Sequence, residues 1–410
     1  MRHLPDRRDV AGAFADLGVL VPIAVALIVS NGLSPTTVLL PAGLLYLAAA
    51  FLYRLPVPVQ PLKAFGAIAI AKGLGVDEIA AGALLMGVIF LVLGGTGLID
   101  LAARAFPRPL IRGVQLTVGL LFLKIAYTLV IHPPEAFADH GTDVAWLVGL
   151  TLACVVLAFA LRRYPIALAL VGIAAVVIAI RADVLRWGPS AVVLPDIDTA
   201  ALASAFVVLV IPQLPLTFAN SCLATADAAK TYFGSAAARV RPGRLAMSLG
   251  AANLFAGAIG GMPVCHGAGG MTAHRTFGAR TGAAPAIIGG TLVLLAVAVG
   301  AGLATLLTAF PLPILAGLLA VSGLLHIALL RDLERPSYWL LAIAIGVVGF
   351  ATNLAIALGA GLIVWWTITW WTGSLLRLRL SPATQHLDAE PAAEVDDAHA
   401  DGRHQERADQ

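Results

Sequence analysis

The chain has 410 residues, of which 60% are hydrophobic and only 12% charged, and its formal net charge is +3. The charged fraction is roughly half that of soluble domains, and apolar runs fill residues 10–376 almost without interruption. This composition excludes an ordinary soluble enzyme or a nucleic-acid-binding protein, and it favours an all-α polytopic membrane protein surrounded by lipid.

The lengths of the apolar runs predict the membrane-spanning segments, because a helix needs about 20 apolar residues to cross the bilayer core. Charges, prolines and glycine clusters divide the chain into about 14 such segments. The segments are 10–30, 35–53, 57–74, 78–100, 108–131, 143–161, 165–181, 200–225, 245–261, 264–275, 282–308, 311–330, 336–352 and 353–376. The third and tenth are short or interrupted. The last two form one apolar stretch divided near Asn353, so a count of twelve or thirteen stays open.

The distribution of basic residues orients these segments. With the N-terminus inside, the division places most of the 26 lysines and arginines on the cytoplasmic side, as in a bacterial inner (plasma) membrane. We therefore predict a cytoplasmic N-terminus at 1–9, a first repeat at 10–181 and a second repeat at 182–376. Residues 377–410 turn polar and acidic and are predicted to form a disordered cytoplasmic tail.

An internal repeat relates the two halves of the chain. The stretch AFPRPLIRG at 105–113 matches AFPLPILAG at 309–317, and Pro58-Val59 matches Pro263-Val264 at nearly the same offset. Seven segments per half is an odd number, so the second copy must enter the membrane with the opposite orientation. The prediction is a set of 7+7 inverted repeats, which is typical of secondary transporters that work by alternating access.

Two stretches at equivalent places in the repeats, 55–69 and 260–282, interrupt the helical pattern. Prolines in the first, and Pro263 with several glycines in the second, remove backbone donors or favour extended backbone. Each stretch predicts an extended piece followed by a half-helix that begins inside the membrane, as segments 3 and 10. Backbone of this kind must be buried in protein or line a polar cavity. Two helix N-termini facing one site would present N–H groups and partial positive charge, which suit an anion.

Four blocks of sequence carry a family resemblance. They are ADLGVLVPIAVAL at 15–27, PVPVQPLKAFGAIA at 56–69, PQLPLTFANS at 212–221 and CHGAGGMTAHRTFGARTG at 265–282. They resemble the plant-type molybdate transporters, a branch of the sulfate permease (SulP) superfamily that lacks a C-terminal STAS domain. The family often has G-D-L-G-T in the first block, where this chain has Ala15 and Val19 at the flanking places.

The resemblance covers most of residues 10–376 and carries expectations about fold and function. It implies a core and a gate built from seven plus seven helices, with the substrate between segments 3 and 10. It also implies transport of a small tetrahedral oxyanion, molybdate first and sulfate second, and it makes a homodimer plausible. No metal and no cofactor are implied.

Candidate substrate-binding residues lie in the interrupted segments and in the eighth span. A lysine inside a span normally pairs or lines a cavity, so Lys63 is expected to contact the anion, with an ion pair to Asp16 as the alternative. Amide, hydroxyl and backbone groups can donate to an oxyanion without a full charge. The further candidates of this kind are Gln60, Gln213, Asn220, Ser221, Cys265, His266 and Gly267.

Asp16, in the first span, cannot attract an anion and is instead the candidate for carrying a coupled proton. Moving a dianion inward against 100 mV costs about 4.6 kcal/mol, so uptake needs cotransported cations or a steep gradient. Helix capping or a structural partnership with Lys63 is the alternative role for Asp16. Lys124 and His326 are expected to be structural, away from the crossing of segments 3 and 10.

Other functions remain as alternatives. Sulfate, bicarbonate or another anion could be the cargo of the same scaffold, and the scaffold could act as an anion channel. A nucleobase site would more usually have an acidic residue in the eighth span, where this chain has Gln213 and Asn220. An intramembrane enzyme built on Cys265, His266 and His274 is disfavoured, because their spacing matches no zinc-binding or nucleophile motif.

Overall fold

A computed structural model describes residues 7–99, 101, 106–161, 164–181 and 186–379. The chain divides into two compact units, Met1–Leu362 and Ile363–Gln410. The described part of the second unit is the end of the last helix, which continues to Arg379. Residues 377–379, where a disordered tail was predicted to begin, are therefore helical, and the rest of that predicted tail lies outside the described residues.

The structure is mostly helical, as predicted. The α-helices are α1 Arg7–Ala13, α2 Leu17–Val29, α3 Pro35–Tyr53, α4 Lys63–Lys72, α5 Val76–Thr96, α7 Arg108–Ile131, α8 Val144–Ala160, α9 Ile166–Arg181, α10 Thr199–Ala205, α11 Ile211–Leu216, α12 Thr225–Phe233, α13 Pro242–Ala258, α14 Ala268–Thr276, α15 Ala283–Ala298, α16 Gly300–Thr308, α17 Leu312–Ala328, α18 Pro336–Ala351 and α19 Leu354–Arg379. Two π-helical segments, η1 Phe206–Val210 and η2 Thr217–Ala224, and two 3-10 segments, η3 Gly234–Arg239 and η4 Leu329–Asp332, continue some of them.

Within the described ranges, six helices are long and apolar enough to cross a membrane, or seven if the bent pair α15 and α16 counts as one span. Four shorter apolar helices, α2, α8, α9 and α18, add to these. The count of about 14 spans stays a prediction.

The predicted span at 282–308 is not one straight helix, because the structure bends it by 93° between α15 and α16. The bend lies at Gly300, the first residue of α16, which packs tightly against Thr36 and the Ser190 backbone. A Cβ at this glycine would lie 2.9 Å from the Ser190 nitrogen and closer still to the Thr36 hydroxyl. Hydropathy carries no information on such a contact with distant residues, so the bend could not be predicted.

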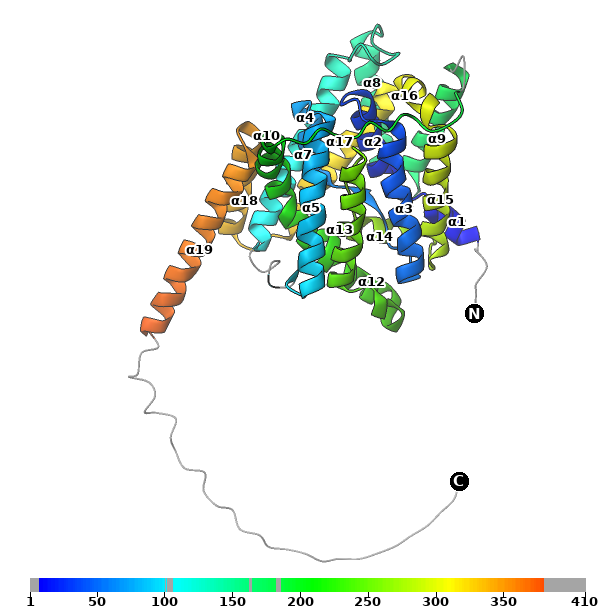
Figure 1. The fold of residues 1–410 in the computed structure, drawn as a ribbon. Coiled ribbons are helices and arrows are strands. Elements are labelled where there is room, and N and C mark those ends of the chain that lie inside the picture. Colours follow the sequence, from blue (N-terminus) through cyan, green and yellow to red (C-terminus); the bar gives the residue numbers. More distant parts are fainter. Residues whose placement is uncertain (1–6, 100, 102–105, 162–163, 182–185, 380–410) are drawn as a thin grey trace, which may run out of the picture. The chain divides into compact units, whose positions relative to one another are not determined.

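Two groups of packed helices make up the first unit. Helices α5, α13, α3 and α15 lie side by side in this order (Figure 1), and glycines allow their backbones to approach closely. In the other group, α7 packs against α8, α17 and α18. The repeated motifs AFPRPLIRG and AFPLPILAG run into the starts of α7 and α17, so the two packed helices are sequence equivalents.

The crossing of α7 and α17 depends on one glycine from each helix. Gly119 and Gly323 face each other, and a Cβ built on either would lie 2.7 Å from the carbonyl oxygen of the other. Because the obstacle is backbone, the helices would have to separate to accept a side chain.

We expect Gly323→Ala to destabilise the protein by about 1–3 kcal/mol through this overpacking. The measurement is thermal unfolding of the purified protein in detergent, which should show a lower Tm. The matched control is Gly290→Ala in α15, where a Cβ meets nothing within 4 Å. An unchanged Tm for Gly323→Ala would contradict the close crossing.

Candidate functional site

Two short extended segments, one from each half of the chain, pair with each other in the first unit. Strands β1, Gln60–Pro61, and β2, Val264–Cys265, form an antiparallel pair in which Gln60 is opposite Cys265. Asn253 of α13 holds β2 by donating to the Val264 carbonyl at 2.8 Å and accepting from the Val264 N–H at 2.7 Å. The extended backbone expected at these two stretches is therefore present.

A short helix follows each strand. Helix α4 has ten residues and begins at Lys63, and α14 has nine and begins at Ala268. Neither has a side-chain N-cap. The Phe65 N–H in the first turn of α4 donates to Gln213 Oε1 at 3.0 Å, while Ala268 and Gly269 in the first turn of α14 line a cavity. First-turn N–H groups have no partner within their own helix, so both N-termini offer donors to this region.

The cavity has a volume of about 1040 Å³ and is lined by residues from both repeats. Seven of the nine residues proposed from sequence for substrate or proton binding line this cavity. These are Asp16, Gln60, Lys63, Gln213, Asn220, Ser221 and Cys265. The volume is ample for a tetrahedral oxyanion with part of its hydration water.

Lys63 is the cation at the start of α4. Its side chain is half-buried, and within the described part of the chain it makes no hydrogen bond and no ion pair with another residue. The ion pair with Asp16 that was the alternative role for this lysine is therefore not formed. An ammonium group at a helix N-terminus adds its charge to the partial positive charge of the helix, which is a strongly anion-attracting arrangement.

Asp16 lies just before α2 and is 6% exposed. Gln60 donates from Nε2 to both carboxylate oxygens, each at 2.6 Å. Gly270 in the first turn of α14 packs directly on this carboxylate, and a Cβ there would collide with Oδ2. The carboxylate of Asp16 thus sits at the N-terminal turn of α14, where the helix dipole favours a negative charge.

His266 and Gly267 do not line the cavity. The ring of His266 is fully buried, its Nδ1 lies 2.9 Å from the Pro58 carbonyl, and its Nε2 lies 2.9 Å from the Ser248 hydroxyl. The bond to Pro58 ties the two extended segments together, and the bond to Ser248 ties them to α13. Gly267 packs against the Gln60 side-chain oxygen, where a Cβ would collide.

A π-helical segment presents Asn220 and Ser221. Residues 199–233 run as one helical stretch in which η1 and η2 flank Pro212 and Pro215. Prolines remove ladder donors, and wider π turns are a common accommodation near functional sites. Both polar atoms of the Gln213 side chain are hydrogen-bonded within the protein. Its Oε1 accepts from the Phe65 N–H, and its Nε2 donates to the Thr217 hydroxyl at 3.0 Å.

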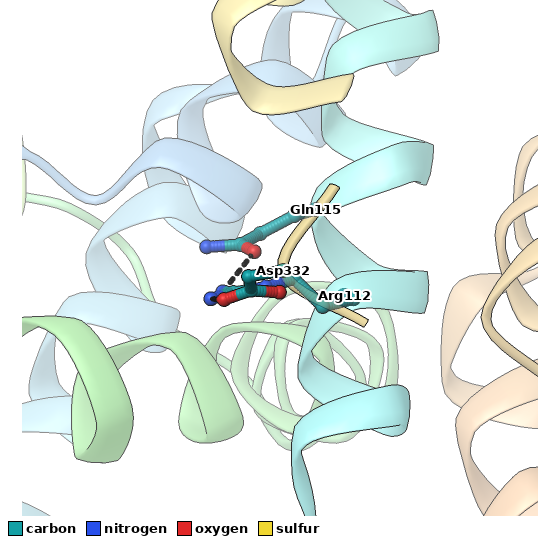
Figure 2. Close-up of polar contacts among 3 residues, drawn as sticks. All are labelled: Arg112, Gln115 and Asp332. Carbon is teal, nitrogen blue, oxygen red and sulfur yellow. Dashed lines mark hydrogen bonds and ion pairs between the residues drawn. The ribbon is translucent and has the colours of Figure 1, made fainter. Parts of the chain in front are cut away.

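Arg112 near the start of α7 forms an ion pair with Asp332 at the end of η4. Figure 2 shows Arg112 of α7 between Asp332 and Gln115, with Nε donating to Asp332 Oδ1 at 2.7 Å and Nη1 donating to Gln115 Oε1 at 2.7 Å. Arg112 Nη2 also donates to Asp332 Oδ2. All three residues line the cavity, so a basic residue is present there but its charge is already paired.

Sequence reasoning missed several cavity residues. Gln115, Ser322 and His326 line the cavity, although His326 was expected to lie away from it. They come from α7 and α17, which read from sequence as uninterrupted apolar spans. Their polar side chains within such spans were the only signal, and they do not reveal which helix face meets the cavity.

The part of the chain that is described contains no cluster of three or more His, Cys, Asp or Glu side chains able to hold a metal ion.

Comparisons with known proteins identify the family of the chain. Residues 8–122 and 205–325 match a family described as molybdate transporter of MFS superfamily. Molybdate transporter 1 of Arabidopsis thaliana is 29% identical over 395 residues, covering 86% of each chain. Molybdate transporter 1 of Chlamydomonas reinhardtii is 30% identical over 447 residues, covering 80% of this chain and 84% of the relative.

Solved structures share the fold at low sequence identity. The transmembrane domain of a cyanobacterium bicarbonate transporter, BicA, has a TM-score of 0.63 at 18% identity and covers 87% of this chain and 98% of that chain. Murine Solute Carrier 26 family member A9, an anion transporter in the inward-facing state, has a TM-score of 0.65 at 14% identity and covers 90% of this chain and 70% of that chain.

Proposed function

This chain belongs to the molybdate transporter family, and from this premise we propose that it is a secondary active transporter of a tetrahedral oxyanion, with molybdate as the principal substrate. Its relatives are named transporters, so it is not an enzyme. It is a multi-pass membrane protein, and we propose a bacterial inner membrane, both termini in the cytoplasm and a homodimeric assembly.

The observation that carries the proposal is the unpaired Lys63 ammonium in the cavity. An uncompensated charge inside a membrane protein is expensive and is retained where a ligand completes it. Near it, the first turn of α14 and the amide of Asn220 supply neutral donors. An anion held by one cation and several dipoles is bound firmly enough to be selected and weakly enough to be released.

In the proposed mechanism, α4 and α14 act as half-helices whose N-termini meet the anion, and the cavity opens to one side of the membrane at a time. Asp16 carries a coupled proton. The Gln60 side chain suits this role, because its amide nitrogen donates to a carboxylate and its amide oxygen, which has no partner within the described residues, can accept from a carboxylic acid. One cotransported proton lowers the electrical cost of dianion entry from about 4.6 to about 2.3 kcal/mol per 100 mV.

Uptake of labelled molybdate into vesicles containing the purified protein tests this function. We expect saturable uptake that an inward proton gradient drives to accumulation and that excess sulfate competes with only weakly. Equal competition by sulfate would make molybdate one substrate among several. Non-saturating flux that only equilibrates would indicate a channel, and absence of uptake of either anion would refute the proposal.

A further inference from the structure

His326 is a titratable cavity residue for which the proposed mechanism has no role. It lies in the last turn of α17 and lines the same cavity as Lys63 and Asn220. Position 326 is the equivalent of Phe122 at the offset that relates the two AFP motifs, and the two rings meet edge to face with centroids 5.9 Å apart. The ring is therefore held in place where the repeat-equivalent helices α7 and α17 meet.

One hydrogen bond sets the tautomer of His326. Its Nδ1 lies 2.8 Å from the carbonyl oxygen of Ser322, one turn earlier in α17. A carbonyl oxygen only accepts, so Nδ1 carries a proton, and in the neutral ring Nε2 carries the lone pair. Within the described ranges Nε2 has no hydrogen-bond partner, and unlike the buried Nε2 of His274 it is not shut off from the cavity space.

We propose that His326 contacts the transported oxyanion and binds a proton together with it: the imidazolium donates from Nε2 to a bound tetrahedral dianion, whereas the neutral ring presents a lone pair there and repels it. The inference rests on the proposed function and adds a second proton to the one assigned to Asp16. Two protons per dianion make transport electrically neutral. Entry then no longer works against the membrane potential.

The charges around His326 allow this behaviour. The Lys63 ammonium on α4 lines the same cavity as His326, so an anion bound between the two groups would offset their mutual repulsion. The bound dianion is then the group that shifts the balance toward the imidazolium.

Apart from Arg108 and from Asp16, which carries its own coupled proton, the other ionisable groups on the elements packed against α17 are already engaged or lie outside the cavity. Asp16 next to α2 is bonded to Gln60, Arg112 of α7 is paired with Asp332 of η4, and Arg181 of α9 is paired with Asp139. Lys124 of α7 lies over the Phe350 ring, and neither it nor Cys154 of α8 lines the cavity. Arg108 of α7 is exposed and lines the cavity.

The test is the pH dependence of KM for molybdate uptake, measured without a pH difference across the vesicle membrane. In the wild type we expect KM to rise about fivefold or more between about pH 5.5 and about pH 7.5, as the imidazolium is lost. His326→Gln keeps a neutral donor and should reduce this rise to the part that Asp16 contributes. His326→Phe keeps the ring packing without the donor and should show the weak, high-pH affinity throughout.

Both variants are compared with His132→Gln, a histidine substitution at the end of α7 outside the cavity, which should keep the wild-type profile. Elution volume and Tm establish that each variant folds, and if the glutamine variant does not fold, the phenylalanine variant decides. A wild-type pH profile and KM in a folded His326 variant would overturn the inference and leave the transport function intact. Failure of the wild type itself to take up molybdate would instead refute the proposed function.

Discussion

Lys63→Ala is expected to lower kcat/KM for molybdate uptake by about 10- to 100-fold, because a hydrogen bond to a charged group contributes about 1.5–3 kcal/mol. Lys63 is the one residue of the proposed site that brings a full positive charge to the start of α4. Its removal leaves only dipoles to compensate a dianion in a region of low dielectric constant. The loss should fall on affinity first and so should raise KM.

Lys124→Ala is the matched control for this experiment. Lys124 is also a lysine within an apolar helix, but it lies over the Phe350 ring, 6.0 Å from the ring centroid, and does not line the cavity. We expect it to retain wild-type kcat/KM. Lys63→Arg should recover part of the lost activity, since the charge is kept while the shape of the donor changes. Wild-type kinetics in a folded Lys63→Ala protein would exclude Lys63 from substrate binding.

Local chemistry predicted the irregular parts of the fold well. The prolines before Lys63 and the glycines before Ala268 predicted extended backbone followed by a helix, and the structure has strands at Gln60–Pro61 and Val264–Cys265 directly before α4 and α14. These features follow from the backbone limits of proline and glycine, which act within a few residues. The same reasoning could not predict the bend at Gly300, which depends on residues far away in the chain.

The candidate site was predictable only as far as unusual polar residues mark it. Lys63, Gln60 and Asp16 were identified because they are costly in apolar segments, and the structure brings them to one cavity. The bond between Gln60 and Asp16, formed in place of the alternative pairing of Asp16 with Lys63, depends on side-chain directions that hydropathy does not report. For the same reason His326 was assigned a structural role although it faces the cavity.

The ionised carboxylate of Asp16 and the bound anion would both be attracted to the N-terminus of α14. The carboxylate lies against Gly270 in the first turn of α14, beside Ala268 and Gly269, which line the cavity. An ionised Asp16 therefore offsets the partial positive charge of the α14 N-terminus, which we propose binds the anion. The same carboxylate also repels a dianion. Protonation removes both effects. Binding of a proton and binding of the anion then favour each other, which is the thermodynamic requirement for cotransport.

Asp16→Asn should weaken the ability of a proton gradient to drive molybdate accumulation, because one of the two coupled protons is lost, while exchange of internal for external molybdate continues. Asparagine has the shape of the protonated acid, and its side-chain oxygen can still accept from Gln60. With the negative charge gone, KM without a gradient should fall relative to the wild type. The measurements are gradient-driven uptake and counterflow in the same vesicles, with the charge moved per molybdate obtained from the dependence on membrane potential.

The control is Asp227→Asn, which removes a carboxylate that also lines the cavity but is exposed at its position in α12. It should keep gradient-driven accumulation, because the coupled proton is assigned to the buried carboxylate of Asp16 and not to this exposed one. Accumulation by Asp16→Asn equal to that of the wild type would assign the coupled proton elsewhere. Exchange does not require proton coupling. Loss of counterflow as well as accumulation in a folded variant would therefore indicate that Asp16 is a structural partner of Gln60 and not the proton carrier.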